Sequence, residues 1–105
     1  MKLFRKILVA NRGEIAVRII QSAHNLGIQA VAIYSSADED SLAVRKADEA
    51  FLLDGLELSE TYLNVDKIIE IAVQSACDAV HPGYGFLAEN THFAKACQDA
   101  NIAFI

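Results

Sequence analysis

The chain has 105 residues, 53% of them hydrophobic, which predicts one folded domain with a single core and excludes a disordered chain. Nine basic and fourteen acidic side chains give a net charge of −5 without a Lys/Arg cluster, so we expect no nucleic-acid partner, because phosphate backbones need a concentrated basic face. No apolar stretch approaches the roughly 20 residues that cross a bilayer, and no secretory signal is present, so we expect no membrane partner. A cytoplasmic location is expected; a mitochondrial one, with a presequence removed, is the less favoured alternative.

Short apolar runs alternate with amphipathic segments along the chain. In the first half of the chain they predict a strand at 6–10, a helix at 14–26 ending at Gly27, a strand at 29–34 and a polar surface loop at 35–46 with at most a short helix from about Ser41. The second half is predicted to contain strands at 50–53, 78–80 and 102–105. Between these strands we expect a helix at 65–76 capped by Asn64 and a helix at 91–100 between Asn90 and Asn101. The strands are predicted to be buried on both faces. Because crossovers of this length join parallel strands by right-handed connections, the fold class is α/β, an open doubly wound, Rossmann-like parallel sheet of about five strands.

The isolated Cys and His residues indicate no metal site. Cys77 and Cys97 are far apart without a CxxC spacing, so we expect reduced thiols in the core. His24 and His92 have no partners at ligand spacing, and we expect both to be solvated helix residues.

The run HPGYGFLAEN, residues 81–90, follows the fourth predicted strand and precedes the last helix. Pro82 fixes φ and lacks an N–H, whereas Gly83 and Gly85 permit conformations that are closed to residues with a Cβ, so the chain must turn sharply. Tyr84 and Phe86 flank the second glycine, and at least one ring is expected to face a cleft that could hold a planar or anionic ligand. The alternative is a plain strand-to-helix connection whose rings only cap the core.

A second loop, at Asn11, Arg12 and Gly13, is predicted at the same edge of the sheet, beyond the carboxyl ends of the strands, where ligands gather in such folds. Arg12 and the N–H groups that begin the first helix would favour an anion, but a surface charge or an ion pair explains Arg12 equally well. Gly13 is alone, and neither GxGxxG nor GxxxxGK[ST] occurs, so a self-contained NAD or ATP site is not expected.

Four segments occur in an order that resembles a known family: ANRGEIAVRI at 10–19, KADEA at 46–50, YLNV at 62–65 and HPGYGFLAEN at 81–90. Together they resemble the N-terminal, pre-ATP-grasp domain of biotin carboxylase, the ATP-grasp component of acetyl-CoA, propionyl-CoA, methylcrotonyl-CoA and pyruvate carboxylases. The resemblance covers residues 6–105. It implies a ligase that carboxylates carrier-bound biotin with ATP and bicarbonate through carboxyphosphate, with biotin, ATP and Mg as the cofactors of the full-length enzyme.

The resemblance also assigns residues and partners. The wall of the biotin site would comprise His81, Gly83, Tyr84, Gly85, Phe86, Glu89 and Asn90. The supporting first βα turn would comprise Asn11, Arg12, Gly13 and Glu14, and no residue matches a catalytic base or a magnesium ligand. The implied partners are the remaining ATP-grasp domains, the biotin carboxyl carrier and the carboxyltransferase. A homodimer is implied as well, although Gln21 and Asn25 stand where bacterial subunits often carry charged residues at the dimer interface.

Because the chain ends within an apolar run where the family continues, we expect residues 1–105 to be one domain of a longer protein, inactive alone and with apolar surface exposed. Two alternatives stay open. One is the leading domain of another ATP-grasp ligase such as carbamoyl phosphate synthetase, and the other is a non-catalytic flavodoxin-like or receiver-type regulatory module.

Overall fold

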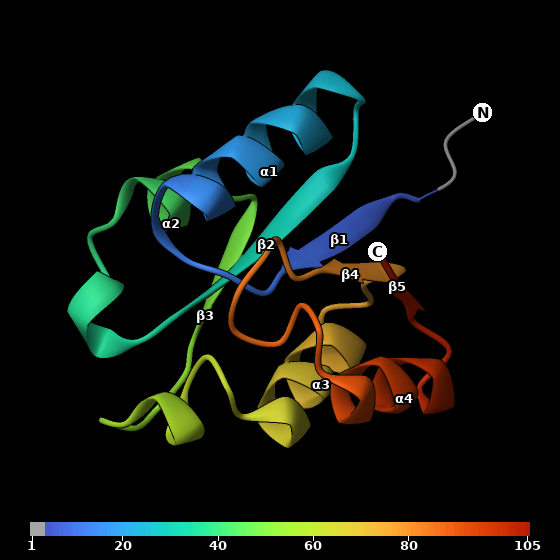
Figure 1. The fold of residues 1–105 in the computed structure, drawn as a ribbon. Coiled ribbons are helices and arrows are strands. Elements are labelled where there is room, and N and C mark those ends of the chain that lie inside the picture. Colours follow the sequence, from blue (N-terminus) through green and yellow to red (C-terminus); the bar gives the residue numbers. More distant parts are fainter. Residues whose placement is uncertain (1–3) are drawn as a thin grey trace.

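The computed structural model describes residues 4–105 as a parallel five-stranded sheet between two layers of helices (Figure 1). The strand order is β3-β2-β1-β4-β5, with bounds β1 (Lys6–Val9), β2 (Gln29–Tyr34), β3 (Glu49–Leu52), β4 (Ala79–His81) and β5 (Ala103–Phe104). Helices α1 (Gly13–Asn25) and α2 (Leu42–Lys46) cover one face, and α3 (Val65–Gln74) and α4 (Thr91–Asp99) cover the other. Short 3-10 turns lie at η1 (Ser36–Asp38) and η2 (Leu58–Glu60). The predicted doubly wound α/β sheet is confirmed.

Alternate residues of the central strand enter the two halves of the core, as the period of a strand requires. Ile7 and Val9 of β1 belong to the cluster under α1, whereas Leu8 belongs to the cluster under α3 and α4. The first cluster is rich in alanine, which lets α1 lie close to the sheet. The second is filled by larger side chains such as Tyr62 and Phe93.

The expectation that all strands are buried on both faces is wrong for β3 and β5. Residues of β3 are half-buried or exposed, and so are the two residues of β5. These are the edge strands of the sheet, so each has a neighbour on one side only. The two edge strands are also displaced or shorter than predicted, because an apolar run does not show where strand pairing stops.

The helix ends follow the predicted caps with one exception. Asn64 and Asn90 accept hydrogen bonds from the backbone N–H groups of the first turns of α3 and α4, and Asn101 takes the left-handed conformation (φ 60°) after α4. Helix α3 ends at Gln74, two residues before the predicted end, because Ala76 is itself left-handed (φ 60°). In the loop at 35–46 a short helix, α2, does follow Ser41, whose side chain caps it.

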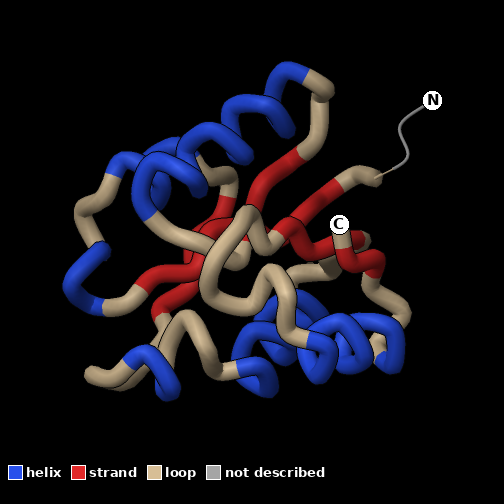
Figure 2. The backbone as a smooth tube through the Cα atoms, viewed as in Figure 1, coloured by secondary structure: helices blue, strands red, loops and turns tan. Residues whose placement is uncertain are grey.

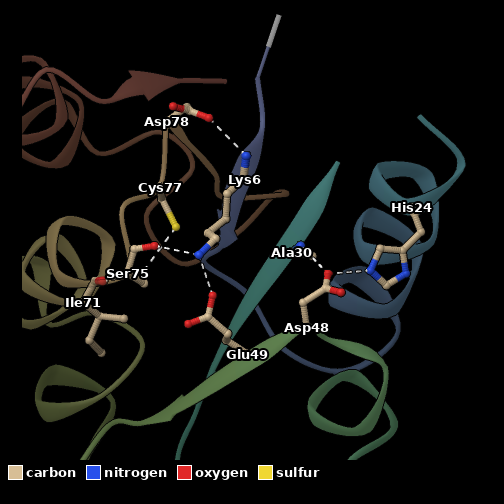
Figure 3. Close-up of polar contacts among 9 residues, drawn as sticks. All are labelled: Lys6, His24, Ala30, Asp48, Glu49, Ile71, Ser75, Cys77 and Asp78. Atoms are coloured by element: carbon tan, nitrogen blue, oxygen red, sulfur yellow. Dashed lines mark hydrogen bonds and ion pairs between the residues drawn. The ribbon is translucent and has the colours of Figure 1, made fainter. Parts of the chain in front are cut away.

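Polar side chains join three segments, β1, β3 and the stretch between α3 and β4, at the end of the sheet opposite the loop at residues 81–90 (Figure 3). Lys6 Nζ on β1 donates to Glu49 Oε2 on β3 at 2.6 Å and to the carbonyl of Ser75 at 2.9 Å. Asp78 Oδ2 accepts from the backbone N–H groups of Arg5 and Lys6 at 2.7 and 3.1 Å. This edge is therefore fixed by contacts between residues that lie more than 40 positions apart in the chain.

His24 is an exposed residue of α1, as predicted, but its ring also contacts an acidic side chain. Its Nε2 lies 2.8 Å from Asp48 Oδ2, which also accepts from the Ala30 N–H at 2.8 Å (Figure 3). The hydrogen bond from Ala30 is the largest cause of the lowered pKa of Asp48, and His24 adds to it. His92 is exposed, as predicted, and both cysteines are buried free thiols. Over residues 4–105, no helix has the length and apolar character needed to cross a membrane.

Candidate functional site

The loops that follow β1 and β4 meet at the carboxyl ends of the two strands, and Asn11 joins them. Figure 2 shows the long loop between β4 and α4 beside the shorter loop between β1 and α1. Asn11 is only 3% exposed, and its Nδ2 donates to the carbonyls of Pro82 and Tyr84 at 2.8 and 2.9 Å. Its Oδ1 accepts from the Arg12 N–H at 2.8 Å. A single buried amide thus fixes the loop between β4 and α4 to the loop between β1 and α1.

The loop between β4 and α4 has three left-handed positions, one before Tyr84 and two after it. Gly83, Gly85 and Phe86 have φ values of 66°, 77° and 41°. A Cβ on Gly83 would lie 2.7 Å from Ile15 Cγ2 and 2.9 Å from Asn11 Nδ2, so glycine is required there by space as well as by conformation. Phe86 has a side chain and adopts the left-handed region at a cost in conformational energy. The sharp turn predicted from Pro82 and the glycines is confirmed.

The two aromatic rings of the loop have different surroundings. Tyr84 is 74% exposed, whereas Phe86 is half-buried and stacks on Tyr62 with ring centroids 5.3 Å apart and planes inclined by 14°. The prediction that at least one ring faces a cleft holds for Tyr84. The alternative, that the rings cap the core, describes Phe86.

Tyr84 borders two open hollows between the HPGYGF loop and α1. One has a volume of about 390 Å³ and is lined by Glu14, Ile15, Arg18, Ile19, His81, Gly83 and Tyr84. The other, of about 460 Å³, is lined by Asn11, Arg12, Gly13, Glu14, Ile15, Tyr84, Gly85 and Phe86. The structure therefore brings together both predicted loops around one exposed ring, with apolar and charged side chains at its sides.

His81 has a defined hydrogen-bonding state in the first hollow. Its Nδ1 accepts from the Gly83 N–H at 3.1 Å, so the neutral ring carries its proton on Nε2. Burial lowers the pKa of His81 and favours this neutral form. The side chain can offer an N–H donor to a ligand beside Tyr84.

Arg12 forms an ion pair, as one of the two interpretations of this residue predicted. Its Nε and Nη2 donate to the two oxygens of Asp38 at 2.7 and 2.6 Å, and Tyr62 Oη donates to Asp38 Oδ2 at 2.6 Å. The hydrogen bonds from Arg12 come first among the causes that lower the pKa of Asp38 to about 2, followed among the lowering causes by the bond from Tyr62. The pKa of Tyr62 is raised, first by burial and then by its bond to Asp38. The guanidinium charge is therefore largely satisfied within the protein.

Some predicted residues stand apart from the hollows. In the part of the chain that the structure describes, Glu89 and Asn90 line neither of them: Glu89 is exposed, and Asn90 caps α4 by accepting from the Phe93 N–H at 2.8 Å. Sequence reasoning did not single out Ile15 and Ile19, which add apolar side chains to the lining of the first hollow. It also missed Asp38, which lies in a segment predicted only as a polar loop.

A larger groove, of about 590 Å³, runs beside the first hollow on the α1 side of the sheet. Its lining is mostly apolar: Phe4, Ile7, Ile19, Ala23, Leu26, Ile28 and Ile105, with Arg18, Ser22 and His81. The expectation of exposed apolar surface agrees with this groove.

The donor set around Tyr84 suits a small, partly apolar ligand more than a metal ion. No group of three or more His, Cys, Asp or Glu residues that could hold a metal occurs among residues 4–105. The hollows offer a ring face, aliphatic side chains, the His81 N–H donor and the carboxylate of Glu14. This arrangement can bind and orient a ligand, but it contains no evident nucleophile.

The fold and the paired loops define a doubly wound α/β domain with a binding edge, and comparison with known proteins gives its family. Residues 3–105 match the family described as biotin carboxylase, N-terminal domain, and the chain belongs to that family. It is 58% identical over 103 residues to a biotin carboxylase of Halalkalibacterium halodurans, a match that covers 98% of this chain and 23% of that one. It is 53% identical over 106 residues to pyruvate carboxylase of Staphylococcus aureus, covering 100% of this chain and 9% of the relative.

A solved structure agrees with the sequence matches. The biotin carboxylase domain dimer of Hydrogenobacter thermophilus 2-oxoglutarate carboxylase, crystallised with MgADP and bicarbonate, superposes with a TM-score of 0.93 at 48% identity, over 99% of this chain and 23% of that chain. This chain thus spans about a quarter of the biotin carboxylases that it matches. These matches support the resemblance seen in the sequence motifs and neither of the two alternatives.

Proposed function

We propose that this domain forms one side of the biotin site in a full-length biotin carboxylase, a ligase that carboxylates carrier-bound biotin with ATP and bicarbonate. The observation that carries the proposal is the Tyr84 ring, which is exposed between two hollows on a loop that Asn11 holds in place. A ring fixed at its backbone and free at its face can pack against a small bicyclic ligand without first becoming ordered.

The neighbouring residues have supporting roles in this proposal. Gly83 and Gly85 allow the turn that exposes Tyr84, Phe86 anchors the loop on Tyr62, and His81 supplies an N–H donor. In the first βα turn, Asn11 holds the loop between β4 and α4, while Gly13 and Glu14 border the hollows. No residue is assigned a catalytic role, because none of these groups is placed as a nucleophile or a general base. Asn90 acts through the start of α4, which its side chain caps.

The cofactors and partners of the proposed enzyme follow from the relatives. The H. thermophilus structure contains MgADP and bicarbonate in a chain about four times as long as this one, which supports a nucleotide and metal site formed outside these 105 residues. The same structure is a dimer, and multidomain relatives include a complete pyruvate carboxylase from Rhizobium etli. We therefore expect the domain to act together with the remaining ATP-grasp domains, a biotin carrier and a carboxyltransferase, and to be inactive alone.

The test is a kinetic comparison in the full-length protein. The wild-type enzyme should cleave Mg-ATP only when both bicarbonate and free biotin are present. Tyr84→Ala should raise the KM for biotin about tenfold or more, since burying an aromatic side chain contributes about 1.5–3 kcal/mol, and should leave the KM for ATP unchanged. Tyr84→Phe keeps the ring and serves as the matched control. Unchanged biotin kinetics in Tyr84→Ala would overturn the assignment of the ring.

A further inference from the structure

We propose that Asp38, a residue outside both hollows, is a positioning residue that couples the first βα turn to the biotin-site loop through Tyr62. The inference rests on the proposed function and adds a residue to the same site. Within the described part of the chain, Asp38 is not among the side chains that line either hollow, so any effect on the ligand must pass through other groups.

The Asp38 carboxylate accepts hydrogen bonds from three segments that lie far from one another in the sequence. Arg12, after β1, gives two hydrogen bonds of 2.7 and 2.6 Å; Tyr62, after η2, gives one of 2.6 Å; and Ser35, after β2, gives a longer one of 3.4 Å from its Oγ. The carboxylate side chain is only 12% exposed. Because charged hydrogen bonds strengthen away from water, these contacts fix the relative positions of the three segments.

Tyr62 carries the constraint from Asp38 to the site loop. It is 2% exposed, and its hydroxyl also accepts from the Ser35 N–H at 3.1 Å. Packing around the ring and hydrogen bonds at the hydroxyl therefore fix the position of this side chain. The ring stacks on Phe86, which is held in the left-handed region at φ 41°. A non-glycine residue stays in that region only where its surroundings hold it there, and the Tyr62 ring is the aromatic contact that does so.

The loop is therefore held at two separate places on either side of the exposed ring. Asn11 binds the carbonyls of Pro82 and Tyr84, and the stack on Tyr62 holds Phe86. Releasing one tie should leave the loop folded but let the Tyr84 ring move. Such a change weakens binding of a ligand that needs the ring in one place, and it leaves the chemistry at the nucleotide unaltered.

The test uses the full-length carboxylase and three variants. Asp38→Asn removes the charge that holds Arg12, Tyr62→Phe keeps the stack but loses the hydroxyl, and Asp40→Asn is the matched control, because Asp40 is an exposed carboxylate two residues away. We expect the KM for free biotin to rise about five- to tenfold in the first two variants, within the range produced by changes away from a binding site. The kcat at saturating biotin and the KM for ATP should change less than about twofold. The control should match the wild type.

Two further measurements separate positioning from general stability. The Asp38→Asn/Tyr62→Phe double variant should be no worse than the more affected single variant, because both changes act through the same link from Asp38 to Tyr62. In the unliganded protein, amide hydrogen exchange at residues 83–87 should quicken in Asp38→Asn by a larger factor than exchange in the strands of the sheet, which report only the global loss of stability.

The outcomes distinguish this inference from the proposed function. If the wild type shows no biotin-dependent ATP cleavage, the proposed function fails, and the exchange experiment still tests the link between Asp38 and the loop. If biotin dependence is present, but biotin KM and loop exchange in both variants equal those of Asp40→Asn, the positioning role is refuted. A fall in kcat and a loss of protection throughout the sheet, with biotin KM unchanged, would refute it as well and leave Asp38 a purely structural residue.

Discussion

Replacing Asn11 by Asp tests the buried amide that joins the two loops, because the side chain keeps its size, loses its donor and carries a negative charge when ionised. The amide Nδ2 lies 2.8 and 2.9 Å from two carbonyl oxygens, and a carboxylate would place an anionic oxygen against both. Two lost hydrogen bonds cost about 1 kcal/mol each, and burying a group left without a partner adds about 1–3 kcal/mol, so we expect the variant to lose about 3–5 kcal/mol of unfolding free energy at pH 7. That is a large share of the roughly 5–15 kcal/mol typical of a domain.

The same substitution predicts a pH dependence that the wild type lacks. Two facing carbonyls disfavour the carboxylate, so the folded-state pKa of Asp at position 11 is raised above its unfolded value. The unfolded chain then loses its proton at lower pH than the folded chain, and stability falls as the pH rises from about 4 toward 7. Urea unfolding of the 105-residue chain at several pH values measures this, with Asn101→Asp, an exposed site, as the control. If Asn11→Asp and the control show the same unfolding midpoint across this range, the amide does not hold the loop.

Three other predictions follow from the described contacts. Gly83→Ala should destabilise the chain by about 2 kcal/mol or more through overpacking and strain. Gly85→Ala has an open environment and should lose only the ~1 kcal/mol that a left-handed alanine costs. Thermal unfolding compares the two variants, and equal losses would contradict the close approach at Gly83. Asp38, whose pKa is about 2 against the usual 3.8, should contribute about 2 kcal/mol of unfolding free energy above pH 4, and this contribution is lost as the pH falls toward 2. Asp38→Asn should be less stable above pH 4, and urea titrations should show a smaller fall in its stability at acid pH. An unchanged fall at acid pH would argue against the Arg12 pair. Burial raises the pKa of Cys97 to about 11 and also that of Cys77, so a disulfide reagent at pH 8 should react with both thiols only after unfolding; rapid reaction of the folded chain would show that the thiols are accessible.

The order and type of the main elements were predictable because local signals agreed with one another. Asn64 and Asn90 precede apolar helical patterns, and both cap helices in the structure. Gly27 follows α1 in the left-handed conformation, as expected of a residue just past a helix end. The edge strands were less predictable, because the pairing of β3 and β5 depends on neighbours contributed by distant parts of the chain.

The parts of the site whose backbone conformation follows from the residue types were predictable. The parts that depend on polar contacts between residues distant in the sequence were not. Pro82 and the two glycines announce the turn that exposes Tyr84. Asp38, in contrast, is one of several acidic residues in a polar segment, and only the fold shows that it alone among them meets Arg12 and Tyr62. His24 is similar, since its partner Asp48 lies 24 positions away, beyond the reach of helix spacing rules.

The position of β1 in the sheet has a consequence for the order in which the domain can be assembled. β1 is the first strand in the chain and the middle strand of the sheet, paired with β2 on one side and β4 on the other. During synthesis, each later strand can add to an edge that already exists: β2 and then β3 on one side, β4 and then β5 on the other. No strand has to be inserted between two others, so the domain can grow outward from its first strand while the rest of the polypeptide is still being made.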